Sequence, residues 1–539
     1  MQEVRGSIPL GSTHYSVQAN PARARWFVSQ AVFRTAAIAI KGRGNGGASG
    51  STLALGVAEF YRGDMPPAAE DSYREALTRA EGHVLEWLGS VNSRRVGPTA
   101  TVEQLTDAFG GPLQDGPIDP GDVVDELART AEPGLMAMPS GKFFGWVIGG
   151  TLPAALGADW MVSAWDQNAA MRLATPATAA AEEVAGQWLL ELLQLPATSA
   201  VGFTTGGTAA NFVGLAAGRQ FVLDQAGWDL DANGMSGSPK ITVLVGEERH
   251  VSVDMAMRYL GLGHGQNVAA DDQGRILPNA LAKALSAIDG PVIVALQAGN
   301  LHSGAFDPMR ECIELAHASG AWVHVDGAFG LWAAVSDEWK ATTDGLDLAD
   351  SWATDAHKTL NVPYDCGVAI VTRPDVLEKV FGARPAYLIQ ADDGPSDPFA
   401  RVPEFSRRAR GVPVWAALRQ LGRSGTIAMV ERMAANARSL AAGIAKLPGA
   451  EVLNDVVFTQ VSLAFGSDER TKAVTQHLIA DGVVWMSGSK WRGRDILRIS
   501  VSNWSTDDVD VAEAIAAVAR AVDAVDAVHA QLGDSPLIA

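Results

Sequence analysis

The chain has 539 residues, of which 47% are hydrophobic and 19% charged, the composition of a folded globular protein rather than a disordered one. Its formal net charge of -19 argues against nucleic acid as a partner, because phosphate backbones are bound by clustered lysine and arginine. Two cysteines are too few for a disulfide framework or a thiolate metal cluster, and no apolar run approaches the roughly 20 residues that span a bilayer. We therefore expect a cytoplasmic protein that binds no metal, membrane or nucleic acid.

The first 66 residues lack any sustained period, and the glycine-rich run at 42–50 is typical of a flexible linker. We expect residues 1–66 to be disordered or to form an extension outside the fold. From Asp71 onward apolar residues recur three and four apart, which predicts a helix and, over 67–143, an N-terminal helical segment.

Residues 144–415 alternate between short apolar runs and helical patterns, which predicts βαβ units and a mainly parallel central sheet flanked by helices. The runs that we interpret as buried strands are 241–246, 291–297, 321–327 and 366–371. From 416 to 539 the pattern changes to alanine-rich helices at 428–446 and 507–531 with two strand-like runs, VFTQVSLAF and ILRISVS. This block predicts a small α+β C-terminal domain, so the fold class is α/β with a second, smaller domain.

Four sites along this pattern carry residues with useful chemistry. In FTTGGTAANF (203–212), Gly206 and Gly207 are flanked by threonines ahead of a helical run, which favours anion binding at a helix N-terminus. His250 follows one strand, Asp326 ends another, and a His-Lys pair, 357–358, precedes a Tyr-Asp-Cys-Gly turn. Each also has an ordinary structural interpretation: a turn, a satisfied histidine, a helix cap and a solvated lysine. Their order favours chemistry, because a pyridoxal 5'-phosphate (PLP) enzyme needs a phosphate loop, a ring partner, a carboxylate for the ring nitrogen and an amine for the aldehyde.

Across about 70–525 the sequence resembles the group II PLP-dependent amino-acid decarboxylases, the aromatic-amino-acid and glutamate decarboxylase-like enzymes of fold type I. The motifs that carry the resemblance are FFGWVIGGTLPAALGADW, TTGGTAAN, GAFDP with WVHVDGAFG, DAHKTLN with YDCG, SRRARGVPVWAALRQLG and LRISVSNWSTDDVD.

The resemblance implies a role for each matching residue. Lys358 would bind the cofactor aldehyde as a Schiff base, and Asp326 would pair with the ring nitrogen. His250 would stack on one ring face and Ala328 would lie against the other. The phosphate would be held by Thr205, Gly206, Gly207 and Thr208, with His357 beside it. On the substrate side, Arg498 would meet the carboxylate, or else form a structural ion pair, and Trp146 and Val147 would line the side-chain pocket or else belong to the core.

Three departures from the family pattern stand out. Asp355 replaces an asparagine that hydrogen-bonds the phosphate, so we expect its carboxylate to turn away or to pair with a cation. Asn300 and His302 lie in AGNLHS (298–303), which replaces a Gly-Thr-Thr run that contacts the cofactor, and either could substitute for it. Phe399 stands near the loop tyrosine that protonates Cα in aromatic-amino-acid decarboxylases, which leaves Tyr387, His302 or His357 as the acid.

The resemblance implies decarboxylation of an L-amino acid to its amine and CO2 in a homodimer whose active site lies at the subunit interface. Two main alternatives stay open, beside the lesser ones of aminotransfer and of another carbon–carbon lyase reaction on the same cofactor. Related aldehyde synthases also lack the loop tyrosine, and they couple decarboxylation to oxidative deamination. The other alternative is a non-catalytic protein with the PLP-enzyme fold, against which the complete set of His250, Asp326 and Lys358 argues.

Overall fold

The computed structural model describes residues 69–383 and 396–533. It divides into two compact units, Met1–Thr78 and Arg79–Ala539. Of the first unit only the start of helix α3 (Ala69–Ser90) is described, and this confirms the helix that the sequence predicted there. The expected extension at 1–66 lies outside the described residues. All of the architecture below belongs to the second unit.

The core of the second unit is a seven-stranded sheet in the order β1-β7-β6-β5-β4-β2-β3. Its strands from β2 to β6 pair in parallel, whereas β7 is antiparallel to both β1 and β6. The expected mainly parallel sheet and its four predicted strands are thereby confirmed. The strands are β1 (Ala200–Thr204), β2 (Thr242–Gly246), β3 (Gln266–Val268), β4 (Val292–Gln297), β5 (Trp322–Asp326), β6 (Ser351–Asp355) and β7 (Gly367–Val371).

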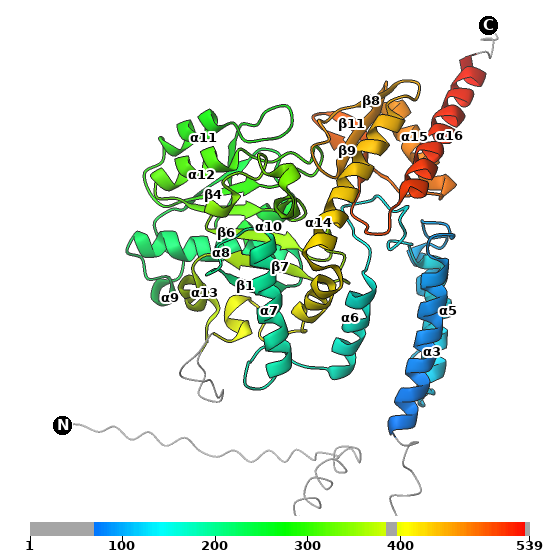
Figure 1. Ribbon diagram of the computed structural model, residues 1–539, viewed down its shortest axis with the longest axis horizontal. Helices are drawn as coiled ribbons and strands as arrows, with labels where there is room; N and C mark the ends of the chain where they lie inside the picture. The colour runs from blue at the N-terminus through cyan, green and yellow to red at the C-terminus, as the bar shows by residue number, and fades with distance from the viewer. Residues whose placement is uncertain (1–68, 384–395, 534–539) are drawn as a thin grey trace, which may run out of the picture. The chain divides into compact units, whose positions relative to one another are not determined.

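Helices cover both faces of this sheet, because its strands carry apolar side chains on both sides. In β4, Val292 and Val294 pack into one core with α7 (Pro176–Leu192), α11 (Pro278–Leu285) and α12 (Met309–Ala318). The alternate residues Ile293 and Ala295 pack into another core with α8 (Gly207–Gln225) and α10 (Val251–Tyr259). Figure 1 shows this layered arrangement of helices and strands.

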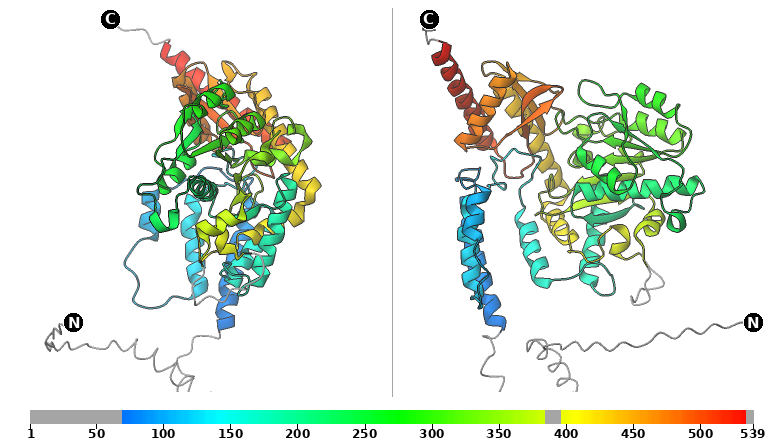
Figure 2. Two further views of the ribbon diagram at one scale, coloured as in Figure 1. Left: turned by 90° about the vertical axis from the view of Figure 1, so that its left-hand side faces the viewer. Right: turned by 180° about the vertical axis from the view of Figure 1, so that it is seen from behind.

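A four-stranded antiparallel sheet follows, in the order β10-β11-β9-β8. Its strands, coloured orange in Figure 2, are β8 (Ala450–Val452), β9 (Gln460–Phe465), β10 (Ser487–Trp491) and β11 (Arg494–Ser500). They share a core with α14 (Gly411–Ile444), α15 (Asp468–Asp481) and α16 (Asp508–Gly533). The two strand-like runs and both alanine-rich helices predicted from the sequence are confirmed, while β8 and β10 were not predicted.

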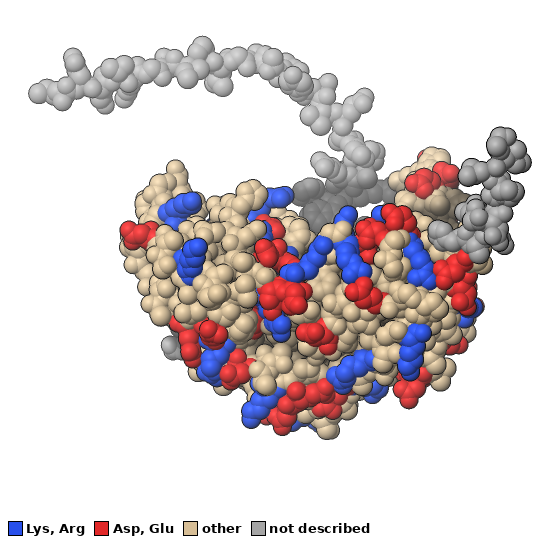
Figure 3. All heavy atoms as spheres, turned by 90° about the horizontal axis from the view of Figure 1, so that it is seen from above, with Lys and Arg blue, Asp and Glu red and all other residues tan. Residues whose placement is uncertain are grey.

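The remaining elements connect these layers. None of the helices in the described part of the chain is long and apolar enough to cross a membrane. On the face shown in Figure 3, acidic and basic side chains are interspersed. The connecting elements are α4 (Val102–Phe109), α5 (Pro120–Ala131), η1 (Glu132–Gly134), α6 (Pro153–Trp165), α9 (Leu230–Asn233), η2 (Gly330–Val335), η3 (Asp337–Trp339), η4 (Leu346–Leu348), α13 (Pro374–Phe381) and η5 (Pro398–Arg401).

Candidate active site

A cavity of about 280 Å³ lies where several loops at the sheet's edge converge. Open α/β sheets bind ligands at such a place, outside the carboxyl ends of the parallel strands. The cavity brings together residues that the sequence separates by more than 150 positions. Its lining residues are Thr205, Gly206, Gly207, Thr208, Ala209, His250, Ser252, Ala328, Asp355, His357 and Lys358.

The loop between β1 and α8 is built to receive an anion. Gly206 caps α8 with φ 139° and ψ 177°, and no side chain hydrogen-bonds to the cap position. Only glycine adopts this conformation without strain. A Cβ atom at Gly207 would lie 2.6 Å from Oδ2 of Asp355, so a side chain would crowd this loop. The first N–H groups of α8 therefore lie at the cavity with the positive end of the helix dipole.

Lys358 lies three residues beyond the end of β6, on the other side of the cavity. Its Nζ is 2.8 Å from Oδ2 of Asp355, which is 2% exposed. The other carboxylate oxygen, Oδ1, is 3.5 Å from Nε2 of His357. The expectation that Asp355 pairs with a cation is confirmed, and Lys358 is that cation. His357 in turn accepts a hydrogen bond at Nδ1 from the backbone N–H of Cys366, and burial lowers its pKa.

Asp326 ends β5 with both carboxylate oxygens already bonded. Oδ2 accepts from Nδ2 of Asn211 at 3.1 Å, and Oδ1 accepts from the backbone N–H of Ala328 at 3.2 Å. The residue is 5% exposed. Asp326 is not among the residues that line the main cavity, but together with His250 it lines a smaller hollow. A carboxylate fixed in this way at a strand end is suited to hold one positively charged partner.

His250 lines the same cavity from the N-terminus of α10. Its Nδ1 accepts from the backbone N–H of Ser252 at 3.2 Å and lies 2.8 Å from Oγ of that serine. Loss of hydrating water lowers the pKa of the imidazole, while the carboxylate of Asp326 acts in the opposite direction. The ring is thus held as a neutral imidazole at the edge of the cavity.

Arg498, on β11, is buried with one donor atom unpaired. It is 5% exposed, and its Nε has no hydrogen-bond partner within residues 69–383 and 396–533. Burial lowers the pKa of its guanidinium to about 10. Its charge also lowers the pKa values of His250 and His302, which places it near both rings.

Asn300 and His302 lie in one turn after β4. Oδ1 of Asn300 accepts from the backbone N–H of His302 at 2.8 Å, so the amide shapes the turn itself. The His302 ring stacks on Trp491 with centroids 6.0 Å apart, and its Nε2 is 3.0 Å from Oγ of Ser489. Burial lowers the pKa of His302 to about 4. The four-stranded sheet therefore fixes this turn through β10.

Trp146 and Val147 differ from each other in burial. Trp146 is 46% exposed and packs on Phe143 and Trp485, while Val147 is 1% exposed and part of the main core. Neither is among the residues that line the cavity. Their segment nevertheless borders the Lys358 turn, because the N–H of Gly150 donates to Oδ1 of Asn361 at 2.7 Å.

Phe399 is a core residue in this structure. It is 3% exposed, and its ring lies 4.8 Å from that of Phe405. Its backbone N–H donates to the carbonyl of Ala170, so η5 is tied to the segment before α7. Tyr387, the other aromatic residue considered for proton transfer, lies outside the described residues.

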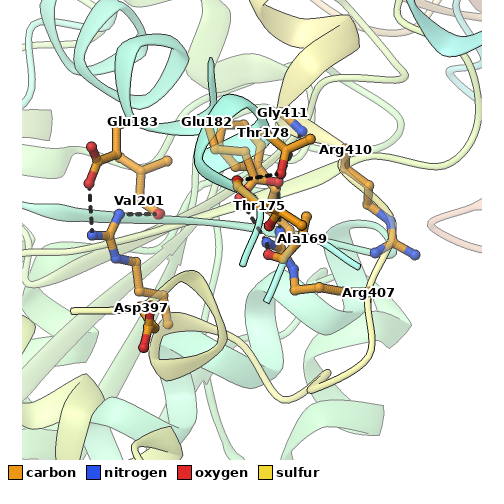
Figure 4. Close-up of polar contacts among 12 residues, drawn as sticks. Ala169, Thr175, Thr178, Glu182, Glu183, Val201, Asp397, Arg407, Arg410 and Gly411 are labelled. Carbon is orange, nitrogen blue, oxygen red and sulfur yellow. Dashed lines mark hydrogen bonds and ion pairs between the residues drawn. The ribbon is translucent and has the colours of Figure 1, made fainter. Parts of the chain in front are cut away.

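Behind the phosphate loop lies an ion pair that the sequence did not reveal. Arg407 and Glu182 are both buried and form two hydrogen bonds, of 2.7 and 3.0 Å. Arg407 also donates to the carbonyl of Phe203 in β1, and Oε1 of Glu182 accepts from the N–H of Gly411. Figure 4 shows this cluster beside β1. It ties α7, the start of α14 and β1 together directly below the loop.

Sequence reasoning also missed Ser252, Ala209 and Asn211. The first two line the cavity, and the third bonds to Asp326. The one available signal for Asn211 was its place at the end of the quoted TTGGTAAN motif. Its partner lies 115 residues away, so no local pattern could have predicted the contact.

The donor set matches a phosphorylated pyridine aldehyde. The glycine loop, in which a side chain at Gly207 would crowd Asp355, and the uncapped N-terminus of α8 suit a phosphate. The carboxylate of Asp326, which accepts a hydrogen bond at each oxygen, suits a protonated ring nitrogen. The amine of Lys358 suits an aldehyde. The residues present thus fit PLP.

Comparisons with known proteins agree with this fit. Residues 105–465 match the family described as the pyridoxal-dependent decarboxylase conserved domain. The aromatic-L-amino-acid decarboxylase of Bacillus atrophaeus is 23% identical over 451 residues, covering 80% of this chain and 92% of that protein. The L-2,4-diaminobutyrate decarboxylase of Rhizobium meliloti is 29% identical over 375 residues, covering 66% of this chain and 72% of that protein.

Solved structures show the same fold. The crystal structure of Oryza sativa TDC with PLP and tryptamine aligns with a TM-score of 0.79 at 22% identity, covering 86% of this chain and 99% of that one. Mouse CSAD aligns with a TM-score of 0.76 at 20% identity, covering 84% and 99%. These likenesses confirm the expected fold-type-I architecture. Because the family match spans well over half of the sequence, the chain belongs to the pyridoxal-dependent decarboxylase family.

Proposed function

We propose that this enzyme uses PLP at the cavity around Lys358 to remove the α-carboxylate of an L-amino acid as CO2, leaving the amine. The observation that carries the proposal is the convergence of three groups on one cavity. These are the uncapped N-terminus of α8, the amine of Lys358 and the ring of His250. Membership of the decarboxylase family sets the reaction class.

Each residue has a proposed task. Thr205, Gly206, Gly207 and Thr208 hold the phosphate, with His357 beside it, and Lys358 provides the amine that anchors the aldehyde carbon. Asp326 keeps the ring nitrogen protonated, while His250 and Ala328 confine the ring from its two faces. When bound, PLP supplies an electron sink for the pair left on Cα as CO2 departs. The ion pair between Lys358 and Asp355 keeps the amine at the cavity before the cofactor binds.

The substrate is held from the other side. We propose that Arg498 meets the substrate carboxylate, because its buried guanidinium has an unmet donor at Nε. Asn300 and His302 shape the adjoining turn, and we place Trp146 and Val147 near the substrate side chain. An aromatic or aliphatic side chain suits such an apolar segment.

The proton that Cα requires needs a donor. Burial lowers the pKa values of His302 and His357, which disfavours their positively charged forms at neutral pH. Phe399 has no proton to give. We therefore favour the hydroxyl of Tyr387 as the acid.

We further infer a homodimer with the active site at the subunit interface, in the cytoplasm. The α6 helix supports an interface, because Trp160, Met161 and Trp165 are large apolar residues with at least 40% exposure. Both Cys312 and Cys366 are buried and free, which suits a reducing compartment. We retain 67–143 as a helical segment, 144–415 as the large domain and 416–539 as the small domain.

The test is to measure amine, CO2 and aldehyde together across a panel of amino acids. The proposal expects equal amounts of amine and CO2 from one class of substrate. Aldehyde with hydrogen peroxide in place of amine would instead establish decarboxylation-coupled oxidative deamination. A protein that binds PLP but releases no CO2 from any amino acid would be a non-catalytic member of the fold, and the proposal would be wrong.

A further inference from the structure

Three polar side chains of β5 are buried against helix α8. Trp322, His324 and Asp326 alternate along the strand and therefore point to one face. Their exposures are 0%, 0% and 5%. A sheet face below a helix is normally apolar, so a buried row of polar groups requires hydrogen-bond partners.

Helix α8 carries matching residues one turn apart. A Cβ atom at Gly214 would lie 2.5 Å from Cε1 of His324, and a Cβ atom at Gly218 would lie 2.7 Å from Cδ1 of Trp322. The two glycines therefore give room to the two rings below them. Asn211 occupies the same helix face, three residues before Gly214, and lies over Asp326.

The donors and acceptors of this row follow a single order from Trp322 to Asn211. The indole N–H of Trp322 can only donate, and it donates to Oγ of Ser351 at 3.0 Å. Ser351 Oγ lies 2.9 Å from Nδ1 of His324, and Nε2 of that ring lies 2.8 Å from Oδ1 of Asn211. Complete burial lowers the pKa of His324 to about 3, so the ring is neutral and carries one N–H. The Asn211 oxygen can only accept, so that N–H is at Nε2, and Nδ1 accepts from Ser351.

Asn211 connects this row of hydrogen bonds to Asp326 and, through Ser252, to His250. Its Nδ2 donates to Oδ2 of Asp326 and to Oγ of Ser252, both at 3.1 Å. Ser252 Oγ also lies 2.8 Å from Nδ1 of His250, and a hydroxyl that accepts from the amide can still donate its own hydrogen to that ring. The backbone N–H of Ser252 donates to the same nitrogen. The proton of the neutral His250 ring must therefore be on Nε2.

We propose that Asn211 is a positioning residue that holds Asp326 and, through Ser252, His250 in one fixed orientation and protonation state for PLP. The proposal deepens the proposed function, because it rests on the roles assigned there to Asp326 and His250. It also links the two ends of the site. Asn211 lies four residues after Gly207, about 6 Å along the helix axis, so the helix that faces the phosphate also orients the partner of the ring nitrogen.

The alternative is a network that stabilises the fold and nothing more. A double-mutant cycle separates the two, with the dissociation constant of PLP for the apoprotein measured by quenching of intrinsic tryptophan fluorescence. If Asn211 acts through Asp326, Asn211→Ala weakens PLP binding by about tenfold to a hundredfold, because a buried acceptor loses its donor. In an Asp326→Ala background the same change should then cost at least about threefold less, because only the link through Ser252 to His250 is left.

A matched control is Asn436→Ala. Asn436 is also a buried helical asparagine, and its Nδ2 donates to the carbonyl of Thr506, away from the cavity. Its loss should lower the melting temperature of the apoprotein but change PLP affinity by less than about threefold in either background. If Asn211→Ala yields no folded protein, Asn211→Ser takes its place in the same cycle.

A second double-mutant cycle tests the link from Asn211 through Ser252 to His250. Ser252→Ala should weaken PLP binding in the wild-type background and have little effect in a His250→Ala background. Equal losses from Asn211→Ala with and without Asp326, or no loss beyond that of Asn436→Ala, would overturn the inference. Failure of the proposed function is distinct, since wild-type protein would then bind no PLP or Asp326→Ala would leave binding unchanged.

Discussion

The proposed cofactor side and the proposed substrate side of the cavity differ in whether their cations have a carboxylate partner. On the cofactor side Lys358 pairs with Asp355, and Arg407 pairs with Glu182 through two hydrogen bonds. On the substrate side Arg498 has no carboxylate partner in the described part of the chain, and its Nε has no hydrogen-bond partner there. Single buried atoms without a hydrogen-bond partner occur on the cofactor side too, at Oδ1 of Asp355 and Nε of Arg407. The contrast suits a resident ligand on one side and a transient ligand on the other.

The largest effect is expected from Lys358→Ala. Without the amine that anchors the cofactor, turnover should fall by at least about a thousandfold. The visible absorbance of bound cofactor should change as well, while the phosphate loop still binds PLP reversibly. Lys379→Ala is the control, because Lys379 is an exposed lysine paired with Asp224. Retained turnover in Lys358→Ala would contradict the role of Lys358 as the anchor of the cofactor.

The next effect tests whether the buried ion pair between Arg407 and Glu182 stabilises the fold. Glu182→Ala leaves Arg407 buried without its partner, so the free energy of unfolding should fall by about 3–5 kcal/mol. Glu183→Ala, one residue away and partly exposed, should cost less than about 1 kcal/mol. Urea unfolding of both apoproteins measures the difference, and equal losses would contradict this account of the buried pair.

Arg498→Met should have opposite effects on stability and on substrate binding. Removing a buried guanidinium whose Nε has no hydrogen-bond partner should raise the free energy of unfolding of the apoprotein by about 1–3 kcal/mol. The same change should raise KM by about tenfold to a hundredfold, because the substrate carboxylate loses its partner, and leave the affinity for PLP unchanged. Arg438→Met, at an exposed ion pair with Glu338, should alter none of these. A fall in stability would show that Arg498 is a structural residue.

The smallest effect concerns His302 and pH. Its pKa is lowered from 6.5 to about 4, so between these values the unfolded chain binds a proton there that the folded chain does not. Stability is therefore lost as pH falls from 6.5 to 4. His302→Gln should reduce that loss by about 2 kcal/mol, the ring being partly exposed. Urea unfolding of the apoproteins at pH 7 and pH 4.5 measures this, and parallel losses in the two proteins would rule it out.

The sequence could predict those parts of the site that lie within short, recognisable motifs. The phosphate loop, Asp326, and the pair His357 and Lys358 lie at the ends of apolar runs, and each is recognisable from a few neighbouring residues. The strands β2, β4, β5 and β7 were predicted for the same reason. Short elements such as β3 and β8, with three residues each, carry too little periodicity to be predicted.

Contacts between distant segments were beyond reach of the sequence. The contact between Asn211 and Asp326 exists only because α8 packs over β5. The partner of Asp355 could be expected as a cation but not identified as Lys358. For Arg498, the sequence left open a substrate contact or an ion pair, and burial without a carboxylate partner in the described residues favours the substrate contact.

One measurement tests the central claim most directly, namely that Lys358 anchors PLP. Protein loaded with PLP is treated with borohydride, which fixes the cofactor irreversibly to the amine that holds it, and the peptides are then mapped by mass spectrometry. The account predicts the added mass on the peptide that contains Lys358, and its absence from Lys358→Ala. Label on another lysine, or no label on protein that carries the visible chromophore, would contradict it.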